Sequence, residues 1–244
     1  MYKYRLAFTK EAPVKYISHL DLSKLFHRAF RRAGLPVAYS EGFNPHPKIS
    51  LASALRLGTT SSAEYLDVDF SEEVDPAEVR ARLQNATPAG IDIGGVQIIP
   101  QEAPAAMALI NAAAYHLSCL KTAEAPSTHK ILAEILAEEE IIITRNTKNG
   151  SKEINIRALI HQADIVCEDD ERVVIHVLLA ASDQGTGRPE ELGMLLRKKG
   201  LCAAEENISV HRTGLYRLYP NGEIRTPFQV LNKESLAKPV EPAK

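Results

Sequence analysis

Polar and apolar side chains alternate over the first residues of the chain. Tyr2, Tyr4, Leu6 and Phe8 are separated by polar or small residues. A period of two predicts a half-buried β-strand.

A helical period follows this strand. The apolar positions are spaced three or four residues apart and form one stripe: Leu22, Leu25, Phe26, Ala29, Phe30 and Ala33. Ser18 with Asp21 three residues later has the form of a capping box, and Gly34 is placed as a C-terminal stop. The pattern predicts a helix over residues 19–33.

Three further strands and a second helix complete the first part. LPVAYS and AEYLDVDF read as strands, Asp75-Pro76 opens a helix, and IDIGGVQIIP closes as a strand. ISLASAL, between the first two, is expected to be irregular or extended. The order β-α-β-β-α-β is the split-βαβ pattern.

The second half repeats this organisation with one extra hairpin at Asn149-Gly150, a strong turn signal. The fold class predicted is therefore α+β, with two tandem ferredoxin-like (split βαβ) domains. The expected boundaries are a first domain at 1–100, a linker at 101–114, a second domain at 115–228 and a disordered tail at 229–244.

Charge is distributed unevenly along the chain. The 244 residues carry a net charge of −2, yet residues 1–60 hold ten Lys and Arg against three acids, a net +7, which leaves −9 on the rest. Four of these basic residues cluster on the polar face of the predicted helix: Lys24, Arg28, Arg31 and Arg32. A basic segment on an acidic body indicates a surface for a polyanion, although solvated helix faces would look the same.

Composition also narrows the class of protein. There is no apolar run of about 18 residues and no signal-peptide pattern, so we expect a cytoplasmic protein with no membrane partner. The three cysteines have no CxxC spacing and the eight histidines no HxH or HExxH spacing. We therefore expect no metal and no cofactor.

The loop YSEGFNPHPK, residues 39–48, follows the basic helix. Its two X-Pro pairs favour an extended, semi-rigid backbone, and Gly42 permits a left-handed turn. It would display an aromatic ring, an amide, an imidazole and a cation, which suit single-stranded RNA. The predicted RNA-binding set combines loop and helix: Lys24, Arg28, Arg31, Arg32, Phe43, Asn44, His46 and Lys48. The alternative is a rigid connector with Phe43 tucked into the core.

The sequence signals for catalytic groups are weaker than those for RNA binding. His19 or His46 could act as acid or base, and Asp67 or Asp69 as base or nucleophile. Asp67 and Asp69 also face Lys3 and Arg5 across two neighbouring strands. That favours a cross-strand salt-bridge ladder over a ligand-binding sheet face.

A second anion site is conceivable in GTGRPEE, where Gly185, Gly187 and Arg188 precede a helix. A plain strand-to-helix connection with positive φ at Gly185 or Gly187 is the favoured alternative.

One long run carries a family resemblance: KYISHLDLSKLFHRAFRRAGLPVAYSEGFNPHPKISLASALRLGTTSSAEYLDVDF. It resembles the signature of the radical-SAM-linked domain family, a bacterial family of unknown function found alone or fused behind a radical SAM module. The resemblance is close over about residues 3–70 and looser to about 225. Because the chain has no CxxxCxxC motif, it looks like the stand-alone form.

Three functional hypotheses remain open. The first is an RNA-binding accessory module for tRNA or rRNA that works with a modifying partner such as a radical SAM protein. The second is an RNA-acting enzyme, nuclease-like or pseudouridine-synthase-like. The third is a protein-interaction subunit with no nucleic-acid role. No preference for DNA is inferred, and whether the protein is an enzyme stays undecided.

Overall fold

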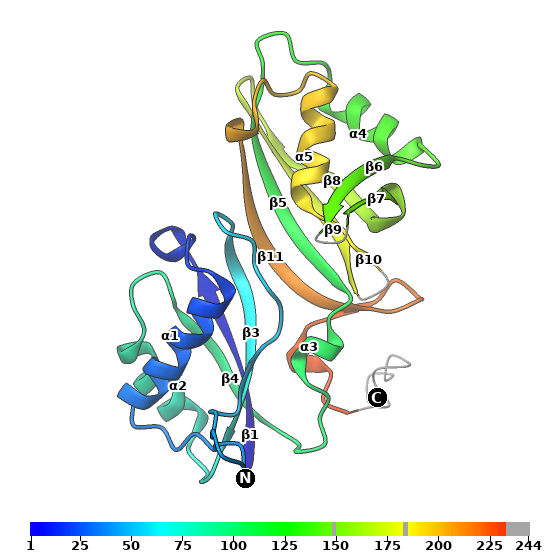
Figure 1. Cartoon of the computed structure of the whole chain (residues 1–244). Coiled ribbons are helices and arrows are strands. Elements are labelled where there is room, and N and C mark those ends of the chain that lie inside the picture. Colours follow the sequence, from blue (N-terminus) through cyan, green and yellow to red (C-terminus); the bar gives the residue numbers. More distant parts are fainter. Residues whose placement is uncertain (148–149, 183–184, 233–244) are drawn as a thin grey trace, which may run out of the picture. The chain divides into compact units, whose positions relative to one another are not determined.

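The computed structural model describes residues 1–147, 150–182 and 185–232 and has a mixed α/β fold (Figure 1). The chain divides into two compact units, which are described separately. Unit 1 combines Met1–Asn111 with the segment from Gly214, and unit 2 is Ala112–Thr213.

Unit 1 begins with the predicted order of elements, β-α-β-β-α-β. Its strands follow the order β2-β3-β1-β4, and each of these neighbouring pairs is antiparallel. The bounds are β1 Tyr2–Lys10, α1 His19–Arg32, β2 Ile49–Leu51, β3 Thr60–Phe70, α2 Pro76–Ala86, β4 Ile93–Ile99 and α3 Ala106–Leu109.

Ser18 is the N-cap of α1, as predicted. The Asp21 carboxylate accepts from the Ser18 hydroxyl at 2.7 Å, whereas in a capping box it would accept from the Ser18 backbone N–H. The Ser18 hydroxyl accepts a hydrogen bond from the Asp21 amide at 3.1 Å. At the other end, Gly34 has a φ of +60°, a conformation that glycine adopts without strain. Between them, Leu22, Phe26 and Phe30 bury the apolar stripe against the sheet.

The core of unit 1 lies between its two long helices and one face of the sheet. That face is made by alternate residues of β1 and β3: Tyr4, Leu6, Phe8, Leu66, Val68 and Phe70. Because side chains alternate across a strand, the residues between them must point to the opposite face.

One predicted strand is wrong. LPVAYS makes isolated bridges, Val37 with Phe70 and Tyr39 with Pro47, and the strand is instead Ile49–Leu51. Pro36 has no N–H to donate to a ladder, so this segment pairs with β3 only locally.

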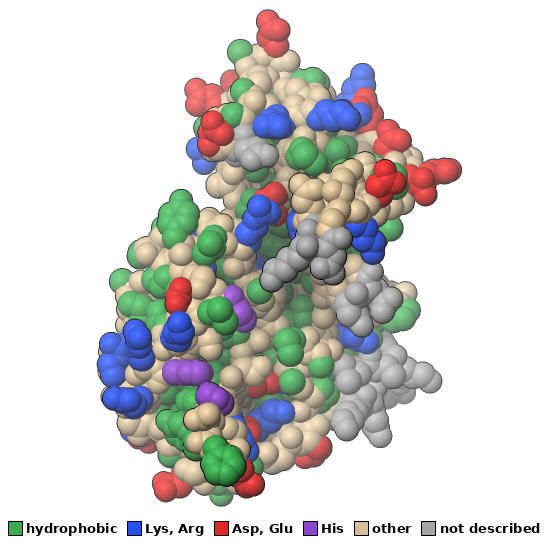
Figure 2. All heavy atoms as spheres, in the orientation of Figure 1, with side chains coloured by type: hydrophobic (Ala, Val, Ile, Leu, Met, Phe, Trp, Pro, Cys, Tyr) green, Lys and Arg blue, Asp and Glu red, His purple; other side chains and the backbone are tan. Residues whose placement is uncertain are grey.

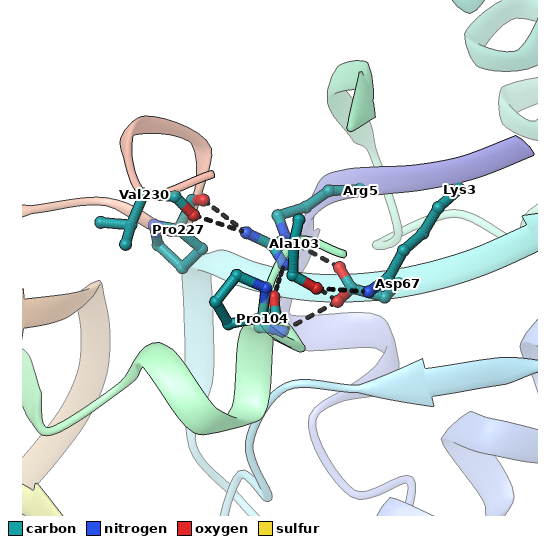
Figure 3. Close-up of polar contacts among 8 residues, drawn as sticks. Lys3, Arg5, Asp67, Ala103, Pro104, Pro227 and Val230 are labelled. Atoms are coloured by element: carbon teal, nitrogen blue, oxygen red, sulfur yellow. Dashed lines mark hydrogen bonds and ion pairs between the residues drawn. The ribbon is translucent and has the colours of Figure 1, made fainter. Parts of the chain in front are cut away.

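The opposite face of the unit 1 sheet is polar but buried (Figure 3). The register places Lys3 opposite Asp69 and Arg5 opposite Asp67, as the ladder hypothesis requires. Arg5 is fully buried and binds both carboxylate oxygens of Asp67, at 2.7 and 3.0 Å. The expected ladder thus takes the form of a buried ion pair of Arg5 with Asp67, while Lys3 donates to the Ala103 carbonyl at 2.7 Å.

Two other segments of unit 1 close over this pair. Arg5 also donates to the carbonyls of Pro104, at 2.7 Å, and Pro227, at 2.6 Å. The Ala106 amide donates to Asp67 at 2.8 Å. The start of α3 and the short helix Pro227–Gln229 therefore cover the polar sheet face.

The last described residues continue this packing. Val230 is fully buried, and Phe228 packs edge-on against Tyr65 with ring centroids 5.4 Å apart. Residues 233–244, most of the segment expected to be a disordered tail, lie outside the described residues.

Unit 2 contains a sheet with helices on one face. β9 pairs with β5, β8 and β10, in each case antiparallel. The bounds are β5 Ala112–Leu120, α4 Thr128–Ala137, β6 Ile142–Thr147, β7 Gly150–Asn155, β8 Ile160–Glu168, β9 Arg172–Ser182, β10 Gly185–Thr186 and α5 Pro189–Lys198. β11, Ile208–Leu218, begins in unit 2 and ends in unit 1, where it pairs with β12, Ile224–Arg225.

The predicted extra hairpin is formed by β6 and β7. Asn149 of the expected Asn-Gly turn lies outside the described residues. Arg145 on β6 makes an ion pair of 2.6 Å with Glu191, which attaches the hairpin to α5.

We predict that Asp67→Ala lowers the free energy of unfolding by about 3–5 kcal/mol, because it leaves the Arg5 guanidinium buried without its counter-charge. Urea unfolding measures this change. The matched control is Lys24→Ala, which breaks an exposed ion pair of 3.7 Å in the same unit and is expected to cost at most about 1 kcal/mol. Equal losses in the two variants would show that the buried pair does not hold unit 1 together.

Candidate nucleic-acid interface

The outer face of α1 carries the predicted basic cluster. Burying the apolar stripe turns the opposite side of the helix to solvent, where its four basic side chains lie: Lys24, Arg28, Arg31 and Arg32. Figure 2 shows Lys and Arg side chains gathered over α1, with His side chains beside them. We call these four residues the α1 basic face.

The α1 basic face is divided between two sides of the helix. Lys24, Arg28 and Arg32 line a groove of about 480 Å³ together with Leu25 and Pro88. Arg32 and Pro88 also line a neighbouring groove of about 310 Å³, which reaches the end of α2. The first recess is thus bordered by Lys24, Arg28 and Arg32, and the adjoining one by Arg32 and Arg82.

Arg31 lies on the other side of the helix. It lines a third groove, of about 250 Å³, together with His27, Tyr39 and Pro47. The sequence did not single out this groove, because its walls come from α1 and from a separate segment that follows it in the chain.

The loop after α1 is closed at its base. The Ser40 amide donates to the His46 carbonyl at 2.8 Å, and the His46 amide donates to the Ser40 hydroxyl at 3.0 Å. Gly42 has a φ of +121°, which a residue with a Cβ would adopt only with strain. We call residues 40–46 the closed loop.

The closed loop presents its side chains to solvent. Phe43 is fully exposed, with 106% of its reference surface accessible, so the alternative in which Phe43 packs into the core is wrong. Asn44 and His46 are exposed as well. Lys48 follows the loop, half-buried, and its amide donates to the Ala38 carbonyl at 2.8 Å.

Histidines of α1 and the closed loop lie close enough to influence each other. Partial burial lowers the pKa of His27, and the nearby His46 lowers it further because two positive imidazoles would repel. His27 is therefore neutral at pH 7, and one ring nitrogen can donate while the other accepts.

The four candidate catalytic residues do not gather at one place. Asp67 lies on the covered sheet face, where Arg5 and the Ala106 amide occupy its carboxylate oxygens. His19 is the exposed first residue of α1, and His46 is in the closed loop. Asp69 is half-buried opposite Lys3. Catalytic roles for these residues stay predictions.

The expected positive φ in the GTGRPEE segment is wrong, since neither Gly185 nor Gly187 has positive φ. A Cβ on Gly187 would come within 3.0 Å of Leu179 and 3.1 Å of the Leu159 carbonyl, so close packing explains this glycine. Anion binding at Gly185, Gly187 and Arg188 stays a prediction. The acidic residues in the first turn of α5 weaken the field that would favour an anion there.

Metal ligands do not cluster in the described part of the chain. Within residues 1–147, 150–182 and 185–232, no group of three or more His, Cys, Asp or Glu side chains could hold a metal ion. Over the same ranges no helix is both long and apolar enough to cross a membrane.

The sequence is similar to one protein family over most of its length. Residues 3–189 match the family model described as "Uncharacterized protein conserved in bacteria (DUF2344)". Among curated proteins no match is found.

Solved structures show a distant similarity. One is entitled "Crystal Structure of a Cbf5-Nop10-Gar1 Complex", with 12% identity, a TM-score of 0.46 and coverage of 87% of this chain and 48% of the other. Another is entitled "Structure of H/ACA RNP bound to a substrate RNA containing 2'-deoxyuridine", with 12% identity, a TM-score of 0.45 and coverage of 87% and 46%. The chain spans about half the length of each.

We predict that the pKa of His27 lies below 6.5, the ordinary value for histidine, and rises in the His46→Asn variant. Removing the neighbouring imidazole removes the repulsion that opposes protonation of His27. An NMR pH titration of the histidine ring protons measures both values, with His19→Asn, on the exposed first residue of α1, as the control. A His27 pKa that does not respond to His46→Asn would contradict the proximity of the two rings.

Proposed function

We propose that this chain, which belongs to the bacterial family of uncharacterised proteins DUF2344, binds RNA through the α1 basic face and the closed loop. One observation carries the proposal. Four solvent-exposed cations of one helix are followed by a closed loop that holds an aromatic ring fully in solvent.

The cations supply affinity for a phosphate backbone. Each Lys or Arg that meets a phosphate releases condensed counterions, which makes binding strong at low salt and weak at high salt. Among the ion pairs between described residues, the α1 basic face takes part in one, the exposed 3.7 Å pair of Lys24 with Asp21. Arg32 also donates a hydrogen bond to the Ala86 carbonyl, and the remaining charge of the face is available to a polyanion.

The closed loop supports RNA over a purely acidic protein partner. Because Phe43 is fully exposed, the packing of unit 1 does not require an aromatic side chain there, and the exposed ring is hydrated unfavourably. An unpaired base offers a flat apolar face on which such a ring stacks. An acidic protein surface would use the cations and leave Phe43 without a function.

The finer assignment combines this surface with the sequence resemblance. In the proposed function the RNA is tRNA or rRNA, the compartment is the cytoplasm, and the protein presents RNA to a modifying enzyme. The resemblance of residues 3–70 to the radical-SAM-linked signature supports a radical SAM protein as that partner. We also interpret each unit as a ferredoxin-like domain, on the order of its elements.

We predict that reversing three charges of the α1 basic face, with Arg28, Arg31 and Arg32 changed to Glu, weakens RNA binding about tenfold or more at low salt. The slope of log K against log salt is expected to fall by about 2, because each single-strand phosphate that is no longer neutralised lowers it by about 0.7. Fluorescence anisotropy with labelled bulk tRNA, titrated at several salt concentrations, measures both quantities.

The matched control is the triple variant in which Arg197, Lys198 and Lys199 are changed to Glu. Arg197 and Lys198 form the exposed end of α5 in unit 2 and Lys199 is its C-cap, so the variant makes the same change in net charge at a comparable position of a helix. It also breaks the ion pair of Lys199 with Glu134. Wild-type binding that is unaffected by salt, or an equal loss in both triple variants, would rule out the α1 basic face as the RNA site. If the protein binds no RNA at low salt, a protein partner must explain this surface.

A further inference from the structure

The groove that contains Arg31 has a mixed lining. It lies between α1 and the segment from Leu35 to Ile49, with a volume of about 250 Å³. Most of its apolar wall comes from this segment, and α1 adds Phe30 and two polar groups. The apolar side chains are Phe30, Leu35, Val37, Pro47 and Ile49, while Tyr39, His27 and Arg31 contribute an aromatic ring, an imidazole and a guanidinium.

The position of this groove relates it to the closed loop. Tyr39 and Pro47 bridge to each other directly outside residues 40–46, so the groove begins where the loop ends. Tyr39 is half exposed, at 52%, although it lines a recess. Its ring is therefore accessible to a ligand from one side.

We propose that this groove holds one unpaired nucleobase, which makes a single-stranded segment the substrate class of the RNA site. The inference rests on the RNA-binding function proposed above. In the proposed site, the Tyr39 ring stacks on the base, His27 forms hydrogen bonds with the polar edge of the base, and Arg31 contacts the adjoining phosphate.

The chemistry of the lining fits a base better than other occupants of the same size. A nucleobase needs an apolar or aromatic surface for its flat face and hydrogen-bonding groups for its edge. Tyr39 and the apolar wall supply the first, and His27 supplies the second. A simple anion would use Arg31 but would leave the apolar wall facing the charge, which is unfavourable.

The protonation of His27 supports its assigned role. Burial and the neighbouring His46 lower the pKa of His27, so the ring is neutral at pH 7. A neutral imidazole offers one donor and one acceptor to a base edge, whereas an imidazolium offers two donors and attracts phosphate instead.

The position of Phe43 argues against a duplex. The tip of the closed loop holds this ring in solvent, and Tyr39 lies at the base of the same loop. Both rings offer surfaces for bases that are not already stacked. The bases of an RNA duplex are paired and stacked inside the helix, and the major groove of A-form RNA is too narrow for side chains to reach them.

The experiment compares one RNA oligonucleotide as a single strand and as a full duplex, by fluorescence anisotropy at fixed low salt. We expect wild-type protein to bind the single strand about tenfold more tightly or better. Tyr39→Ala is expected to weaken binding of the single strand about tenfold, the usual effect of removing a stacking ring. The same change is expected to leave duplex binding unchanged, and Tyr39→Phe, which keeps the ring, is expected to bind both forms like the wild type.

The control is Tyr16→Ala. Tyr16 is also an exposed tyrosine of unit 1, at 73%, and it is not among the residues that line this groove. Thermal unfolding of each variant verifies that it is folded. A second measurement uses a single strand that contains 2-aminopurine, whose fluorescence is expected to be quenched by wild type and by Tyr39→Phe but less by Tyr39→Ala.

Failure of the inference and failure of the proposed function give different results. If neither the wild type nor any variant binds the single strand or the duplex, the proposed function fails. If RNA binding depends on the α1 basic face but Tyr39→Ala lowers the affinity for the single strand no more than Tyr16→Ala does, the protein binds RNA and the proposed base site is wrong. Equal wild-type affinity for single strand and duplex also overturns the base site.

Discussion

The buried pair of Arg5 and Asp67 organises unit 1. A guanidinium that is fully removed from water must find hydrogen-bond partners for its N–H groups, and Arg5 finds a carboxylate on β3 and the carbonyls of Pro104 and Pro227. Three segments far apart in sequence are thereby held on one face of one sheet. The register of β1 with β3 places Asp67 opposite Arg5. The positions of α3 and of the short helix Pro227–Gln229 bring two backbone carbonyls to the same guanidinium.

This arrangement decides which surfaces of unit 1 are exposed. The polar sheet face looked accessible in the alternation of side chains, but the chain's own segments cover it and occupy the Asp67 carboxylate. The other sheet face is filled by α1, α2 and their apolar stripes. The outer surface of α1 and the loop that follows it therefore remain as the chemically distinctive exposed surface.

Local backbone chemistry determines the geometry of the closed loop. The turn at Gly42 and the two X-Pro pairs restrict the backbone, and the reciprocal bonds of Ser40 and His46 join its ends. A restrained loop loses little conformational entropy when it binds a ligand, which favours the proposed stacking of Phe43 on a base. The same closure brings Tyr39 and Pro47 together beside α1 and shapes the groove there.

The sequence by itself determined α1, its cap, its basic face and the pairing of β1 with β3, because these depend on local periodicity and on residues opposite each other in register. It also led to the prediction, still to be tested, that the loop binds a ligand. The tertiary structure alone decided that Arg5 and Asp67 are buried, that 35–40 makes only isolated bridges, and that Arg31 lies on a different groove from Arg28 and Arg32. These outcomes depend on packing between segments that are separate in the chain, which no local pattern encodes.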